Sequence, residues 1–146
     1  MFGACRPIEI PPPVSVPSMS ICFEEVEVSN LSNPEVWGEA FWFMLHLGAA
    51  SAPEFISPEQ AMGYWGFVEG IPLMIPCRNC SQHARQFIAQ HRGDKQNICS
   101  TRGNLFDFFI RFHNAVNKRT GKPLCNSEDM YKKFTGGGVI KKVRYF

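Results

Sequence analysis

The sequence contains no apolar run of the about 18–20 residues that a membrane-spanning helix needs. Its N-terminus lacks the charged-then-apolar pattern of a secretory signal. The formal net charge is only +2, and basic residues gather only in a short run near the C-terminus. So small a charge gives no reason to expect a nucleic-acid partner. We therefore expect a cytoplasmic protein without membrane insertion and without a nucleic-acid partner.

The sequence also lacks internal repeats of about 20–50 residues and any alternation of strand-like with helix-like segments. Its 146 residues suffice for one domain with its own core. Helical patterns with short connections predict an all-α protein, a four-helix bundle with a short fifth helix. We expect a proline-rich N-terminal arm over 1–32, a folded domain over 33–135 and a basic tail over 136–146. The helices are expected at about 34–50, 58–70, 76–91, 103–119 and 127–134.

Polar caps and helix breakers set the expected helix ends. Asn33 and Ser57 are suited to cap the first and second helices, and Ser127 is suited to cap the fifth. Gly70 and Pro72 are expected to end the second helix. Gly121 is expected just after the end of the fourth helix, because glycine is suited to the position that follows a helix C-terminus.

Two of the six cysteines, Cys77 and Cys80, are separated by two residues where an apolar segment meets the third predicted helix. Pro76 is expected at the first position of that helix, and the helix N-terminus favours a thiolate. A thiolate exchanges with disulfides, so the pair indicates redox chemistry. Two alternatives stay open: a zinc site with His83 and His91, or an inert buried pair. Zinc ligands this dense along one helix would converge only if the helix unwound.

Two further motifs fit a bound cofactor, although each also fits an ordinary helix. A polar strip that contains His113 and Asn117 lies beside a phenylalanine-rich stripe, which is suited to a ligand with both a ring and phosphates. In the first helix, Gly38 between Trp37 and Trp42 permits the close approach of a flat group.

Three motifs taken together resemble one family. They are Trp37-Gly38-x-x-Phe41-Trp42-x-x-Leu45-His46, Pro76-Cys77-x-x-Cys80-x-x-His83, and His113-Asn114-x-Val116-Asn117-x-x-x-Gly121-Lys122-Pro123. In this order and with these separations, they resemble the FAD-dependent sulfhydryl oxidases of the Erv/ALR family. The resemblance covers roughly residues 36–134. It is strongest to the members from large cytoplasmic DNA viruses, which implies a cytoplasmic location in an infected cell or an association with the virion.

The resemblance implies an enzyme that forms disulfides in protein dithiol substrates and passes the electrons through FAD to molecular oxygen, giving hydrogen peroxide. Cys77 would exchange with incoming thiols, and Cys80 would lie beside the flavin. A homodimer through the first two helices is implied as well. The resemblance implies an FAD site formed by Gly38, Trp42, His46, His83, His113, Asn114, Val116, Asn117, Lys118, Lys122 and Tyr131.

The chain departs from the family pattern in three ways. Glu39 stands where some members have an arginine. The family's structural disulfide is here expected between Cys99 and Cys125, and no second Cys-x-x-Cys supplies a shuttle pair, which leaves Cys5 and Cys22 without an assigned role. A zinc-stabilised helical adaptor and a flavin-free thiol–disulfide exchange protein are the alternatives. Neither of them needs the first-helix and fourth-helix motifs.

Overall fold

The computed structural model describes residues 30–136 of the chain. The predicted N-terminal arm with Cys5 and Cys22, and nearly all of the predicted basic tail, lie outside the described residues. The elements in chain order are α1 (Pro34–Ala50), α2 (Pro58–Met74), α3 (Arg78–His91), the 3₁₀ turn η1 (Arg92–Asp94), α4 (Lys95–Ile98), α5 (Arg102–Thr120) and α6 (Ser127–Thr135).

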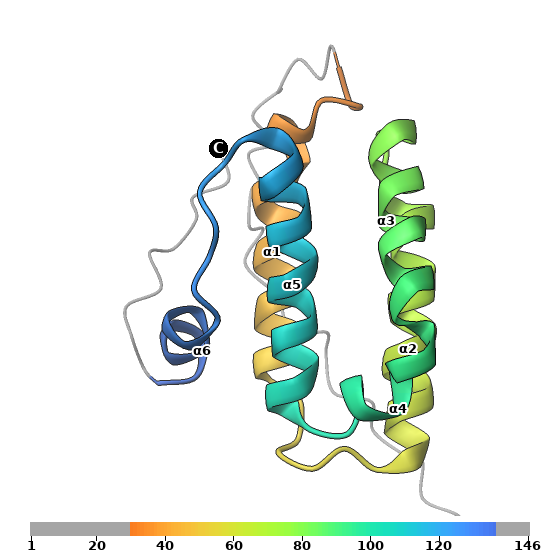
Figure 1. The fold of residues 1–146 in the computed structure, drawn as a ribbon, viewed down its shortest axis with the longest axis vertical. Helices are drawn as coiled ribbons and strands as arrows, with labels where there is room; N and C mark the ends of the chain where they lie inside the picture. Colours follow the sequence, from red (N-terminus) through yellow and green to blue (C-terminus); the bar gives the residue numbers. More distant parts are fainter. Residues whose placement is uncertain (1–29, 137–146) are drawn as a thin grey trace, which may run out of the picture.

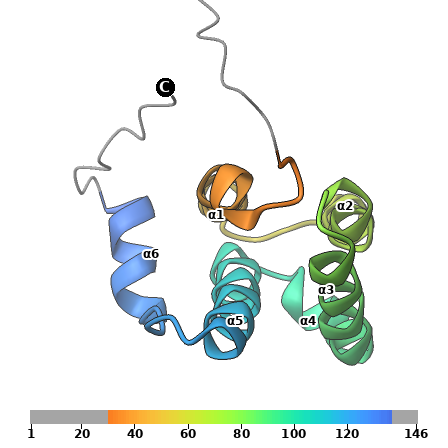
Figure 2. The same ribbon diagram turned by 90° about the horizontal axis from the view of Figure 1, so that it is seen from above.

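The four long helices form two antiparallel pairs, α1 with α5 and α2 with α3 (Figure 1). From above, the four helices lie at the corners of a bundle, and α6 lies outside it against α1 and α5 (Figure 2). Between residues 30 and 136 the only β-structure is an isolated bridge from Phe55 to Thr101, which joins the α1–α2 connection to the start of α5. The predicted all-α bundle with a short extra helix is therefore confirmed.

Most of the predicted helix ends are correct. The Asn33 side chain accepts a hydrogen bond from the Glu35 amide at 3.1 Å, and Ser57 forms a reciprocal capping box with Gln60. Gly121 follows α5 with a φ of 69°, the left-handed conformation that glycine adopts without strain. One cap differs by a single residue, because Asn126 rather than the adjacent serine caps α6.

The junction between α2 and α3 differs from the prediction. Helix α2 does not end at Gly70 or Pro72 but continues to Met74 with Pro72 inside it, and α3 begins after Pro76 rather than at it. The physical reason is Pro76 itself, because a proline disfavours the helical conformation in the residue before it. Ile75 is accordingly extended, with φ −82° and ψ 115°, and ends α2.

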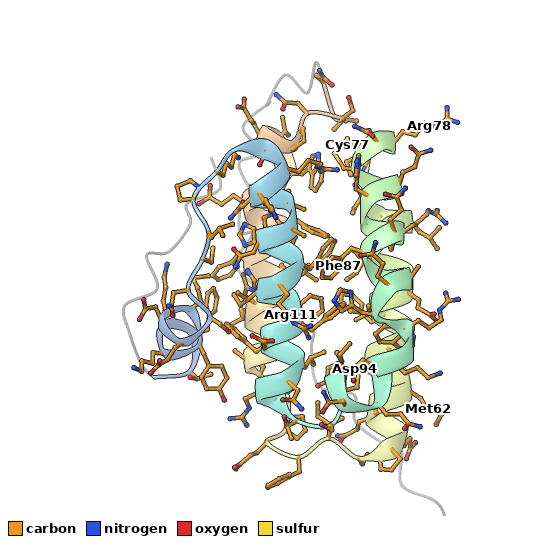
Figure 3. All side chains as sticks on the ribbon, in the orientation of Figure 1. Met62, Cys77, Arg78, Phe87, Asp94 and Arg111 are labelled. Atoms are coloured by element: carbon orange, nitrogen blue, oxygen red, sulfur yellow. A yellow bond between two sulfur atoms is a disulfide. The ribbon has the colours of Figure 1, made fainter. Side chains whose placement is uncertain are left out.

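Aromatic side chains fill the space between the two helix pairs. Phe87 on α3 points toward α5, as Figure 3 shows, and its ring stacks on that of Phe112 with centroids 5.0 Å apart. Phe108 is fully buried and contacts both Phe87 and Trp65. This packing joins α3 and α2 to α5 along the middle of the bundle. None of the helices between residues 30 and 136 is long and apolar enough to cross a membrane.

Candidate functional site: a disulfide beside an aromatic cavity

Cys77 and Cys80 form a disulfide at the N-terminus of α3, with their Cα atoms 5.2 Å apart. Cys77 is the N-cap of the helix, and its Sγ accepts a hydrogen bond from the Cys80 amide at 3.2 Å. Amide donors and the positive end of the helix dipole stabilise negative charge at this position. When the disulfide opens, the sulfur of Cys77 is therefore in a place that favours the thiolate.

Ser81 holds this first turn of α3 against α2. Its hydroxyl donates a 2.7 Å hydrogen bond to the carbonyl of Pro72. Within a regular helix that carbonyl would receive the amide of residue 76, but Pro76 has no N–H. The serine replaces the missing donor and fixes the two helices relative to each other next to the disulfide.

A cavity of about 510 Å³ lies beside the disulfide, between the N-terminal half of α1, the C-terminal half of α5 and the start of α3. We call it the aromatic cavity. Of the two cysteines only Cys80 lines it. The other predicted site residues that line it are Gly38, Trp42, His113, Val116, Asn117 and Lys122.

Several residues that line the cavity were not predicted from the sequence as ligand contacts. Trp37 and Phe112 line the cavity, although their helical spacing is also that of ordinary core residues. Arg119 and Thr120 follow Val116 by three and four residues and so lie on the same face of α5. The spacing of these two residues from Val116 was a signal that could have identified them.

Two histidines and a tryptophan form a stacked group at the cavity wall. The rings of Trp42 and His113 stack with centroids 4.1 Å apart and an interplanar angle of 6°. His46 lies behind them with only 1% of its surface exposed, and its Nε2 is 3.0 Å from Nδ1 of His113. His46 therefore acts on the cavity only through its two neighbours, because it does not line the cavity itself.

Both histidines are held neutral. Burial, with the adjacent His113 as a second cause, lowers the pKa of His46 to about 4. Burial, with Lys122 as a second cause, lowers the pKa of His113 to about 4 as well. With both rings neutral, one of the two facing nitrogens must carry the proton of their hydrogen bond. Nδ1 of His46 is buried without a partner, so we assign the proton to Nε2 of His46, which leaves Nε2–H on His113.

This histidine pair predicts a pH-dependent stability. In the unfolded chain both imidazoles have their ordinary pKa of 6.5 and take up protons as the pH falls below it, whereas the folded pair stays neutral down to about pH 4. The free energy of unfolding should therefore be complete above pH 6.5 and decrease between pH 6.5 and about 4. Urea unfolding of the cofactor-free protein at about pH 7 and about pH 5 measures this loss.

The matched variant for this test is His46→Gln, which has no titrating ring and retains an amide that can donate to His113. The loss of stability between the two pH values should be smaller in the variant than in the wild type. An equal loss in both proteins would contradict the assignment of this pH dependence to the buried pair.

Besides His46, four of the predicted FAD contacts do not line the cavity. His83 lies in a shallow depression beside Phe87, and its Nδ1 is 2.7 Å from the carbonyl of Asn79. Lys118 is exposed on α5. Tyr131 on α6 packs edge-on against Phe106 with ring centroids 5.2 Å apart. The fourth, Asn114, is hydrogen-bonded to the backbone of the segment that follows α5.

The predicted disulfide between Cys99 and Cys125 is wrong, because the structure has both residues as free thiols. Cys99 is buried at the end of α4, next to the start of α5. Cys125 lies beside Asn114 and Asn117, about 20 Å farther along α5 at 1.5 Å per residue. At Cys125 the segment after α5 has folded back only as far as Asn114, which leaves the two sulfurs too far apart to bond.

Nothing between residues 30 and 136 assembles three or more histidine, cysteine or acidic side chains in a geometry that could hold a metal ion. The pair proposed for zinc is joined as a disulfide, and Nδ1 of His91 is 2.8 Å from the carbonyl of Phe87. The zinc hypothesis therefore has no support in this part of the chain.

The aromatic cavity fits a flat, phosphate-bearing ligand such as FAD. Trp37, whose buried Nε1 has no hydrogen-bond partner, lines the cavity, and a Cβ at Gly38 would meet no atom within 4 Å. The volume is in the range of ligand sites. Arg119 and Lys122 line it, and neither forms an ion pair within the described residues. Glu39 lines it too, so its carboxylate opposes a phosphate on the α1 side.

Comparison with known proteins identifies the family. The sequence profile described as "Erv1 / Alr family" matches residues 39–135. The chain belongs to this family. It is 35% identical over 102 residues to the FAD-linked sulfhydryl oxidase 096R of Invertebrate iridescent virus 3, covering 70% of this chain and 68% of that one. It is 37% identical over 105 residues to the FAD-linked sulfhydryl oxidase 347L of Invertebrate iridescent virus 6, covering 70% of this chain and 95% of that one.

Solved structures agree with the family assignment. The FAD-binding domain of Erv1 from Saccharomyces cerevisiae is 26% identical, with a TM-score of 0.60 over 77% of this chain and 97% of that domain. The yeast Erv1 core is 24% identical, with a TM-score of 0.69 over 84% of this chain and 98% of that core, and shows that the two share a fold.

Proposed function

We propose that this Erv1/Alr family chain is an FAD-dependent sulfhydryl oxidase that forms disulfides in protein substrates. The single observation that carries the proposal is the position of Cys80. It is half of a disulfide and also part of the wall of the aromatic cavity, beside Trp42 and His113. The disulfide therefore connects Cys77, which would react with substrate thiols, to a cavity that is suited to a flavin.

The proposed reaction begins at Cys77. A substrate thiolate attacks its Sγ, a bond forms between the two sulfurs, and Cys80 leaves as a thiolate on the cavity side. The second substrate thiol, as its thiolate, then attacks the mixed disulfide and displaces Cys77, which leaves the substrate oxidised by two electrons and the pair reduced. The Cys80 amide and the helix N-terminus stabilise the thiolate released at Cys77.

A bound FAD would supply the two-electron chemistry that restores the Cys77–Cys80 disulfide and reduces molecular oxygen to hydrogen peroxide. Gly38, Trp42, His113, Val116 and Asn117 would form the walls of the flavin site. Lys122 and Arg119 would supply positive charge to its phosphates. Trp37 would add an aromatic wall, and Cys80 would lie against the flavin ring.

The stoichiometry of the reaction tests the proposed function. Purified protein supplied with FAD and a reduced dithiol peptide should consume one oxygen and release one hydrogen peroxide for each disulfide formed, because both half-reactions move two electrons. An oxygen electrode, a peroxide assay and a free-thiol assay measure the three quantities. Disulfide formation without oxygen uptake would contradict the oxidase and would instead identify a thiol–disulfide exchange protein.

We propose that two copies of the chain associate through a groove between α1 and α2. Exposed Met44 and Phe67 line it, and Gly48 and Gly63 keep it open. Met44→Glu would place a charge in this apolar surface, so the variant should sediment as a monomer where the wild type sediments as a dimer. The control is Met62→Glu, which changes another exposed methionine, on α2 and outside the groove. A monomeric wild type, or a dimeric Met44→Glu, would contradict this interface.

We also propose that the enzyme acts in the cytoplasm of an infected cell. The support is the similarity to proteins of two iridescent viruses. In this compartment the glutathione pool keeps most protein thiols reduced, so stable disulfides require a dedicated oxidant. Fractionation of cells that produce the protein, with an antibody against the chain, would test the location.

A further inference from the structure

Asn114 belongs to the polar strip that the sequence analysis assigned to the cofactor, but its side chain does something else. Its Nδ2 donates a hydrogen bond to the carbonyl of Cys125 at 2.9 Å. Its Oδ1 accepts one from the amide of the same residue at 2.7 Å. Both ends of the side-chain amide are thus bonded to the backbone of one residue, eleven positions along the chain.

The segment between α5 and α6, residues 121–126, is held at its other end by Asn117. The backbone carbonyl of Asn117 accepts the amides of Gly121 and Lys122, and its Nδ2 donates to the carbonyl of Pro123 at 2.9 Å. Asn114 and Asn117 therefore bind this segment at two points to consecutive turns of one helix face.

Lys122 is attached to Asn117 through its own amide, three residues before the Asn114 attachment at Cys125, and its side chain lines the aromatic cavity. It forms no ion pair within the described residues and is largely exposed, so nothing but the backbone of its segment determines where its ammonium group lies. A lysine side chain loses rotamer freedom when it is held at a ligand, and a loose backbone would add to that cost.

We propose that Asn114 is a positioning residue: it fastens residues 121–126 to α5 and thereby holds Lys122 at the cavity, where its ammonium group would meet the phosphates of a bound cofactor. This inference rests on the proposed function for the identity of that cofactor. The attachment of residues 121–126 to α5 through Asn114, which we call the clamp, is present in the chain without cofactor.

The chain contains its own reporter for the clamp, because the clamped residue is a free, half-buried cysteine. In Asn114→Ala without FAD, alkylation of Cys125 by iodoacetamide, followed residue by residue with mass spectrometry, should be faster by about tenfold or more, as expected for the loss of two hydrogen bonds. Cys99 is buried and reports global unfolding, so its rate should rise much less.

The matched control variant is Asn104→Ala. Asn104 is on the same helix and also binds the backbone and side chains of a neighbouring segment, at Asn97 and Ser100. This substitution should leave the Cys125 rate unchanged. If Asn114→Ala fails to fold, Asn114→Asp keeps the acceptor for the Cys125 amide and should show an intermediate rate. An unchanged Cys125 rate in both Asn114 variants would overturn the clamp.

FAD binding distinguishes positioning from simple loss of stability. Asn114→Ala should lower FAD affinity about tenfold at low salt in the wild-type background and hardly at all in a Lys122→Ala background, since it acts through that lysine. The salt dependence of FAD affinity should weaken in both single variants. Additive effects of Asn114→Ala and Lys122→Ala would overturn the proposal. A wild type that binds no FAD would overturn the proposed function and the role of Lys122, while the Cys125 rates would still decide on the clamp.

Discussion

Replacement of Cys80 by serine is expected to lower dithiol oxidase activity by at least about a thousandfold, because residues that act as one catalytic unit lose nearly all turnover when one is removed. A hydroxyl group cannot form the disulfide that the substrate thiolate attacks. It also leaves no thiolate at the cavity wall, where Cys80 lies. Oxygen uptake with a dithiol peptide measures the loss.

The matched control is Cys99→Ala, which removes a buried free thiol near the start of α5, whereas the aromatic cavity is lined by the C-terminal half of that helix. It should lower the melting temperature, because it leaves a small void in the core, but it should retain oxidase activity. FAD content should be close to wild type in both variants. Substantial oxidase activity in Cys80→Ser would contradict the assignment of the catalytic disulfide.

Gly38→Leu is expected to lower FAD affinity at least about 100-fold, or about 2.7 kcal/mol. A Cβ at this position meets no protein atom within 4 Å, and Gly38 lines the aromatic cavity, so the rest of the leucine side chain would enter that cavity. The folded protein without cofactor should become more stable, by up to about 0.8 kcal/mol, because leucine has a higher helix propensity than glycine. Titration of the cofactor-free protein with FAD, together with urea unfolding, measures both effects.

The opposite signs of the two effects make this variant informative. A variant that misfolds would lose both stability and FAD affinity, whereas a folded variant with a filled cavity would lose FAD affinity alone. Gly66→Leu is the control, since Gly66 also lies in a helix with open space around its Cα but does not line the aromatic cavity. Equal FAD affinity in Gly38→Leu and in the control would contradict the position of the flavin.

The caps and the hydrophobic periods were enough to predict the bundle, since Asn33, Ser57 and Gly121 have one strongly preferred use each. The α2–α3 junction was less predictable because Pro76 can either begin a helix or force the preceding residue out of one. Pro72 likewise fits a helix end or a last turn whose free carbonyl finds another donor, and here Ser81 supplies that donor.

The residues of the site also fall into those that the sequence predicts and those that it does not. Cys77, Cys80 and the face of α5 with His113 and Asn117 follow from spacing along single helices. Asn114 does not, because a side-chain amide in a polar strip serves a ligand or a backbone equally well. The choice depends on the path of residues 121–126, which have no periodic pattern. The same path separates Cys125 from Cys99 and explains why their pairing could not be judged from their positions in the sequence.

The central claim is that electrons pass from a dithiol through the Cys77–Cys80 pair to a flavin held in the aromatic cavity. The most direct measurement is the visible spectrum of the purified protein, with FAD supplied if needed, before and after a dithiol is added without air. Flavin absorption should bleach with the dithiol, return when oxygen is admitted, and resist bleaching in Cys80→Ser. A protein that stays colourless with added FAD, or a bound flavin that the dithiol does not bleach, would contradict the claim.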